Sequence, residues 1–115
     1  MTSTAISRLT LLAAIAGLAA VGAVSADGAG KSIFVENKCS TCHAISAAGI
    51  ARTGAATAKT PPDLSTVGTR RTAAFIVKFL KKEEAIEGRK HVLKFKGSDE
   101  QLGTLADWLV GLKAG

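Results

Sequence analysis

Sulfur-containing residues are scarce in this sequence: its 115 residues include two cysteines and one methionine. The cysteines stand close together at Cys39 and Cys42, so the chain cannot build a framework of several disulfides. The methionine is Met1, which is lost if the chain carries a cleaved leader. A mature chain would then hold no thioether able to bind a metal.

Acidic residues are in the minority, since 9 Asp and Glu stand against 15 Lys and Arg and give a formal net charge of +6 at pH 7. Such an excess favours acidic protein partners and fast electrostatic association. The lysines are scattered along the chain and the N-terminus indicates export. Nucleic acid is therefore not an expected partner.

The N-terminus has the pattern of a secretory signal peptide. Arg8 precedes an almost unbroken apolar stretch, Leu9–Val24, and Val24-Ser25-Ala26 has the small residues of a cleavage site. We expect residues 1–26 to be removed and residues 27–115 to form one domain in the periplasm, taking the source to be a Gram-negative bacterium. A cleaved leader leaves no stable membrane insertion, whereas an uncleaved one would be a membrane anchor.

The two cysteines belong to one run, Cys39-Ser40-Thr41-Cys42-His43. This spacing is the attachment pattern of c-type haem, in which two thiols about one helical turn apart add to the vinyl groups of the porphyrin. The histidine that follows is placed to bind the iron. Zinc sites and thiol oxidoreductases also use Cys-x-x-Cys. Zinc needs four ligands and only His91 stands outside the run, and no βαβ pattern is present, so we expect one covalent haem c.

The rest of the chain predicts an all-α protein, with no alternating strand pattern and no repeat. Three segments have the periodicity or caps of helices. The first is residues 29–37, and the second is capped by Thr69 or Thr72 and runs to about Lys82. The third follows the capping box Ser98-Asp99-Glu100-Gln101. Residues 83–87 predict a weak helical continuation that Gly88 ends. Residues 44–61 are rich in small residues, which cannot bury enough surface to hold a helix in place, and they predict a long loop.

Further residues around the haem motif resemble those of a known family. Gly30 and Phe34 look like its N-terminal helix, and Trp108 looks like the aromatic of its C-terminal helix, which packs against them. On these residues the chain resembles the small monohaem class I cytochromes c of bacteria over residues 28–113. The resemblance implies the class I cytochrome c fold, with three to five short helices wrapped around one covalently bound haem.

The segment Pro62-Asp63-Leu64 resembles the Pro-x-Leu segment of the same family. There the proline carbonyl accepts the second ring N–H of the haem-motif histidine, which fixes the tautomer and raises the basicity of the ligand. The resemblance implies this role for Pro62 and a contact between Leu64 and the haem face. One of the two arginines that follow, Arg70 or Arg71, can pair with a haem propionate, and we take Arg70 as the candidate.

One departure from the family concerns the second axial ligand. The family usually supplies a methionine from the loop before the last helix, and here that loop contains His91 instead. A second imidazole would give six-coordinate iron at a lower potential than a thioether does. The alternatives are five-coordinate iron, with His91 in solvent, or ligation by Lys90 or Lys94 after the loss of a proton.

These alternatives separate the possible functions. If His91 occupies the sixth coordination position of the iron, no substrate can bind there and the haem can only gain or lose an electron. The protein is then an electron carrier. Five-coordinate iron would bind a small gas or peroxide, and a third possibility is the haem subunit of a larger oxidoreductase. No catalytic base stands out, so we expect a carrier that meets redox partner proteins and not an enzyme. The lysines placed to meet an acidic docking surface are Lys38, Lys90, Lys94 and Lys96.

Covalent attachment can be tested by mass. We expect the mass of the denatured protein to exceed that of its polypeptide by one haem, because both thiols form thioether bonds. The haem should stay with the protein in acidic acetone, and Cys42→Ala should keep a single bond and a less stable holo-protein. A mass equal to that of the bare polypeptide would contradict the attachment.

Overall fold

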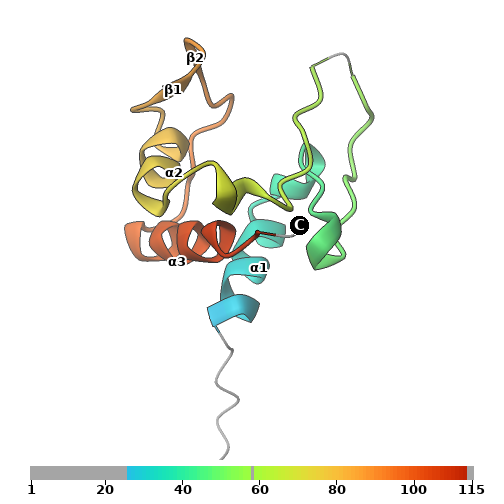
Figure 1. Cartoon of the computed structure of the whole chain (residues 1–115), viewed down its shortest axis with the longest axis horizontal. Coiled ribbons are helices and arrows are strands. Elements are labelled where there is room, and N and C mark those ends of the chain that lie inside the picture. Colours follow the sequence, from blue (N-terminus) through green and yellow to red (C-terminus); the bar gives the residue numbers. More distant parts are fainter. Residues whose placement is uncertain (1–25, 58, 114–115) are drawn as a thin grey trace, which may run out of the picture.

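The computed structural model describes residues 26–57 and 59–113. It contains three α-helices, three 3-10 turns and one short hairpin: α1 (Ala26–Glu36), η1 (Cys39–Thr41), η2 (Ser46–Ala48), η3 (Val67–Thr69), α2 (Ala73–Leu80), β1 (Ala85–Ile86), β2 (Arg89–Lys90) and α3 (Asp99–Val110). In Figure 1, α3 lies against α1, with α2 and the hairpin on one side and the loop after η2 on the other. The predicted all-α class is confirmed.

The predicted signal peptide, residues 1–26, lies almost entirely outside the described residues, and its cleavage stays a prediction. Among the residues that are described, no helix combines the length and the apolar character needed to cross a bilayer.

Side-chain caps begin the two later helices. The hydroxyl of Thr72 accepts a hydrogen bond from the Phe75 N–H at 3.1 Å, which starts α2. At α3 the capping box is complete: Ser98 accepts from the Gln101 N–H at 3.1 Å, and the Gln101 side chain accepts from the Ser98 N–H at 3.0 Å. Because these bonds satisfy amide groups that have no partner inside the helix, they determine where each helix begins.

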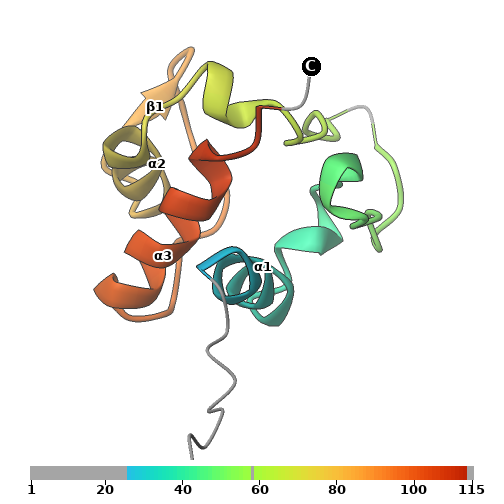
Figure 2. The same ribbon diagram turned by 60° about the horizontal axis from the view of Figure 1, so that its bottom comes forward.

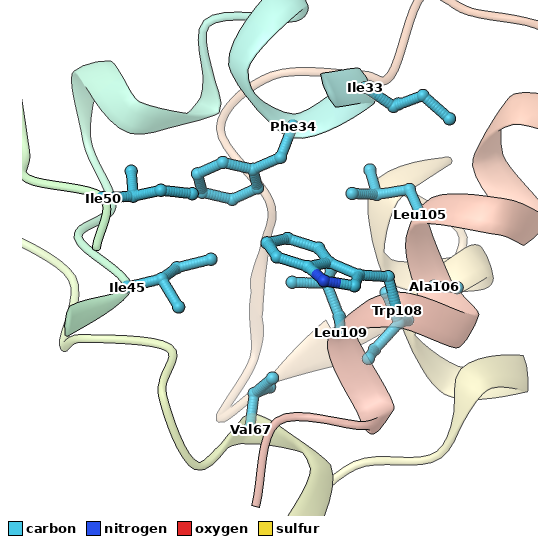
Figure 3. Packing of buried hydrophobic residues seen from close by; sticks show 10 residues of the cluster. Ile33, Phe34, Ile45, Ile50, Val67, Leu105, Ala106, Trp108 and Leu109 are labelled. Carbon is cyan, nitrogen blue, oxygen red and sulfur yellow. The ribbon is translucent and has the colours of Figure 1, made fainter. Parts of the chain in front are cut away.

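Helices α1 and α3 cross each other, as Figure 2 shows, and residues of both helices form the centre of the core. Gly30 lets the helices approach so closely that a Cβ atom at this position would lie 2.1 Å from the Cβ of Trp108. The Trp108 ring packs against Phe34 with ring centroids 5.9 Å apart and planes inclined by 59° (Figure 3). Both contacts agree with those that the family resemblance implied.

The loop over residues 44–61 contributes two residues to the core. Ile45 and Ile50 pair their backbones in both directions, at 2.9 and 3.0 Å, and η2 closes the turn between them. Their side chains enter the core, and Ile45 is fully buried (Figure 3). The segment is a loop, as predicted, and it can bury single apolar residues without an α-helix or a sheet because it pairs its own backbone groups.

The predicted helical continuation over residues 83–87 is wrong. The chain leaves the helical path at Lys82, which has a φ of 62°, and strands β1 and β2 pair as an antiparallel hairpin. Glu87 and Gly88 form its turn with φ values of 50° and 76°. Two consecutive residues with positive φ are typical of the tight turn that suits the twist of a hairpin. The second strand ends directly before His91.

The close crossing predicts a large difference between two glycine substitutions. Gly30→Ala should destabilise the holo-protein by about 1–3 kcal/mol or more, because the new methyl group overlaps Trp108. Gly103→Ala is the matched control: no atom lies within 4 Å of the added carbon, and the change should be neutral or add about 0.5–1 kcal/mol through helix propensity. Guanidinium unfolding measures both, and equal stabilities would contradict the importance of the crossing.

Candidate haem-binding site

The haem motif begins where α1 ends. Lys38 adopts a left-handed conformation with a φ of 58°, and η1 then forms one tight turn. The carbonyl of Cys39 accepts hydrogen bonds from the backbone N–H groups of Cys42, at 3.2 Å, and His43, at 3.0 Å. This turn keeps both thiols and the imidazole within one short segment, as attachment by two thioethers requires. Burial raises the pKa of the Cys39 thiol, and Cys42 is exposed.

The loop that follows folds back onto the motif. The N–H of Thr53 donates to the carbonyl of Ser40 at 2.8 Å, and that of Gly54 donates to the carbonyl of Thr41 at 3.0 Å. A Cβ atom at Gly54 would lie 2.4 Å from the Thr41 oxygen, so a residue without a side chain is required. Both accepting residues lie between the two cysteines. The loop therefore supports the spacing of the thiols, a role that the sequence did not reveal.

His43 is half-buried next to Pro62. Burial lowers the pKa of the His43 ring, His91 lowers it further, and the Pro62 carbonyl opposes the fall. The ring is therefore neutral at pH 7, which is the form that binds iron. Its Nδ1 atom is buried and makes no hydrogen bond of normal geometry. Pro62 and the ring are neighbours, as the resemblance implied, and a well-aligned hydrogen bond between them stays a prediction.

His91 has a backbone partner of its own. Its Nδ1 atom lies 2.5 Å from the carbonyl oxygen of Leu93. Because a carbonyl oxygen only accepts, Nδ1 carries the proton in the neutral ring and Nε2 keeps its lone pair. The Phe79 ring meets the imidazole edge-on, with centroids 5.3 Å apart and planes inclined by 73°. Neither contact was predicted from the sequence, because the first depends on the backbone conformation of the loop and the second on how the loop returns to α2.

Two further bonds hold the loop that contains His91. The Lys82 ammonium group donates to the carbonyl of Val92 at 3.3 Å, and the N–H of Phe95 donates to the carbonyl of Leu80 at 2.9 Å. They tie the two ends of this short segment to the C-terminal end of α2. The position of the imidazole is thus determined by α2 and not by the loop alone.

The imidazole rings of His43 and His91 lie near each other and are almost parallel. Their centroids are 6.2 Å apart and their planes differ by 9°. A metal ion bound by two imidazole nitrogens at about 2 Å each separates the ring centroids by about 6 Å. The two rings come from segments far apart in the sequence and make no hydrogen bond to each other. The pair therefore fits an iron atom held between them.

A cleft of about 300 Å³ opens beside this pair. Its lining combines apolar side chains, the haem-motif thiol and lysines: Asn37, Lys38, Cys39, Leu80, His91, Leu93, Lys94, Phe95 and Lys96. An apolar macrocycle attached at Cys39 would lie against the half-buried Leu80 and Phe95, so the residues present fit a covalently bound haem. Three of the four lysines predicted to surround the haem line this cleft, and the exception, Lys90, is exposed on β2.

The remaining candidate residues lie around the same region. Leu64 is half-buried and packs on the core cluster, and its N–H donates to the carbonyl of Ala44 at 3.0 Å. The guanidinium group of Arg71 lies over the Phe75 ring, 4.9 Å from the centroid. Within the described part of the chain, the Arg70 side chain is exposed and makes no hydrogen bond or ion pair. Contacts of Leu64 and Arg70 with haem stay predictions.

Comparison with known proteins agrees with this site. The sequence model of the cytochrome c family matches residues 28–113, a range that contains the haem motif, Pro62, His91 and Trp108. No curated protein and no solved structure matches the chain. Members of the family carry covalent haem c, and Cys39 and Cys42 stand where its attachment requires them. The chain belongs to the cytochrome c family.

Proposed function

We propose that this protein is an exported electron carrier whose haem iron is bound by two histidines, His43 and His91. Family membership supports haem-based electron transfer. The observation that supports the proposed ligation is the pair of nearly parallel imidazoles, with ring centroids 6.2 Å apart and planes 9° from parallel. Each ring also lies beside a backbone carbonyl, that of Pro62 for His43 and that of Leu93 for His91.

Each group of the site has a definite task in this proposal. Cys39 and Cys42 hold the haem through thioether bonds, and the haem supplies reversible one-electron chemistry. His43 is kept neutral by burial and presents a lone pair from one face. His91 is held in the Nδ1–H tautomer by the Leu93 carbonyl and presents Nε2 from the other. If both imidazoles bind the iron, no coordination position would remain for a substrate, so we infer a carrier and not an enzyme or gas sensor.

The cleft also indicates how a partner docks. Val92 and Leu93 follow His91 directly and are 85% and 66% exposed. Apolar side chains exposed beside Lys94 and Lys96 form a surface that suits a partner with an acidic rim and an apolar centre. We propose that redox partner proteins bind here, close to the axial ligand. The predicted leader and thioether attachment both favour the periplasm as the location.

Substitution of His91 tests the ligation. His91→Ala should convert low-spin iron to high-spin and allow the ferrous protein to bind CO, because the sixth position opens. His91→Met should restore low-spin iron at a higher potential. Lys94→Ala is the control for lysine ligation and should leave the spectrum unchanged. Absorption spectra of the reduced proteins, with and without CO, report all three.

The unaltered protein provides the decisive comparison. If its ferrous form is already high-spin and binds CO at once, His91 is not a ligand and the carrier proposal gives way to gas binding. If Lys94→Ala alone opens the iron to CO, the sixth ligand is lysine.

The docking proposal predicts a salt-dependent reaction. Lys94→Gln/Lys96→Gln should slow the oxidation of the reduced protein by hexacyanoferrate(III) severalfold at low ionic strength, because two positive charges leave the cleft. Lys59→Gln/Lys78→Gln removes the same charge from exposed residues that do not line the cleft. Stopped-flow measurements at several salt concentrations compare the two variants. Equal rates would show that only the net charge matters.

A further inference from the structure

Asp63 is the centre of a hydrogen-bond cluster that the electron-carrier function does not by itself require. One carboxylate oxygen accepts from the backbone N–H of Ser46, at 3.0 Å, and from its hydroxyl group. The other accepts from the N–H of Ser65, at 2.7 Å, and from the Ser65 hydroxyl. The Ser65 hydroxyl in turn accepts from the N–H of Ala47 at 2.9 Å. Three of these five hydrogen bonds join two short segments of the chain, residues 46–47 and 63–65.

The cluster lies next to both His43 and Pro62 in the sequence. Its first segment, residues 46–47, comes shortly after His43, and Asp63 directly follows Pro62. The hydrogen bond from Leu64 N–H to the Ala44 carbonyl, 3.0 Å long, adds a tie between the same two segments. Residues 63–65, which follow Pro62, are therefore hydrogen-bonded to residues 44–47, which follow His43.

The hydrogen bonds to Asp63 are stronger than those between two neutral groups, because the accepting carboxylate is charged. They hold the pKa of Asp63 well below its usual range, with the hydroxyl of Ser46 as the largest cause and that of Ser65 next. The carboxylate is exposed, so solvent screens its charge and the net stabilisation of the fold is small. What the cluster provides is a definite geometry, since four donors from two segments converge on one planar group.

We propose that Asp63 is a positioning residue, which holds the carbonyl of Pro62 against the ring of His43 and thereby sets the reduction potential of the haem. The proposal rests on ligation of the iron by His43. A carbonyl that accepts the second N–H of a ligating imidazole makes the ring a better electron donor and favours the ferric state. Loosening the cluster should weaken that interaction and raise the potential.

The test separates position from charge. Ser46→Ala/Ser65→Ala removes the hydroxyl donors and keeps the carboxylate, whereas Asp63→Asn removes the charge and keeps the shape. Asp107→Asn is the control, because Asp107 is an exposed carboxylate on α3 outside this cluster. Measurements on the holo-proteins are the reduction potential and, by NMR, the exchange rate of the His43 Nδ1 proton with water.

We expect the double serine variant and Asp63→Asn to raise the potential and to speed the proton exchange severalfold, with the low-spin spectrum retained. Asp107→Asn should leave the exchange rate unchanged. Ser65→Ala alone should give a smaller shift of the same sign, which keeps the test available if the double variant loses haem.

Two results would overturn the proposal. If the double serine variant has the potential and exchange rate of the unaltered protein, the cluster only holds the loop. If Asp63→Asn shifts the potential no more than Asp107→Asn, the effect is that of charge. A failure of the ligation itself looks different, because the unaltered protein would then lack the NMR signature of an iron-bound His43.

Discussion

The close contact between α1 and α3 constrains everything else in this structure. Gly30 and Trp108 bring the two helix axes together, and Phe34 fills the space beside them. Because α1 ends only a few residues later, this contact also determines where η1 and the thiols lie. Ile45 and Ile50, from the loop after the motif, pack on the same cluster and hold the other end of the haem segment. The site is therefore supported from both sides.

The two proposed ligands are positioned in different ways. His43 belongs to a segment whose backbone is bonded to the loop after it, through Thr53 and Gly54. His91 lies at the end of a hairpin and depends on α2, whose Phe79 and Leu80 contact its loop. A hairpin is stiffer than an open loop of the same length, because its turn and strands fix the backbone dihedral angles. This stiffness suits a ligand that has to meet a metal at a set distance.

Charge and apolar surface lie together at the opening of the cleft. Small electron carriers form short-lived complexes, which depend on fast electrostatic approach and on limited apolar contact. Lysines beside the exposed Val92 and Leu93 provide both at one place. After Met1 the sequence has no methionine that could supply the thioether usual in the family, and His91 is the ligand we propose in its place. The expected consequence is a carrier that works at a lower potential.

The sequence by itself determined the haem motif, the helical class and the capping box at Ser98, which follow from local spacing or from a residue type that has few alternatives. The contact of Gly30 with Trp108 was implied by the resemblance to a known family. The sequence also identified His91 as the candidate for the second axial ligand, because the chain has only two histidines and one belongs to the motif.

Only the tertiary structure decided how the segments around the haem meet. The hairpin after Lys82 was not visible, since its turn depends on positive φ values at residues that are ordinary helix formers, such as Glu87. The burial of Ile45 was missed, because the small residues around it give no periodic pattern. The Leu93 carbonyl and the Asp63 cluster were missed as well. They are contacts between backbone or short polar groups brought together by folding, and such contacts leave no spacing rule in a sequence.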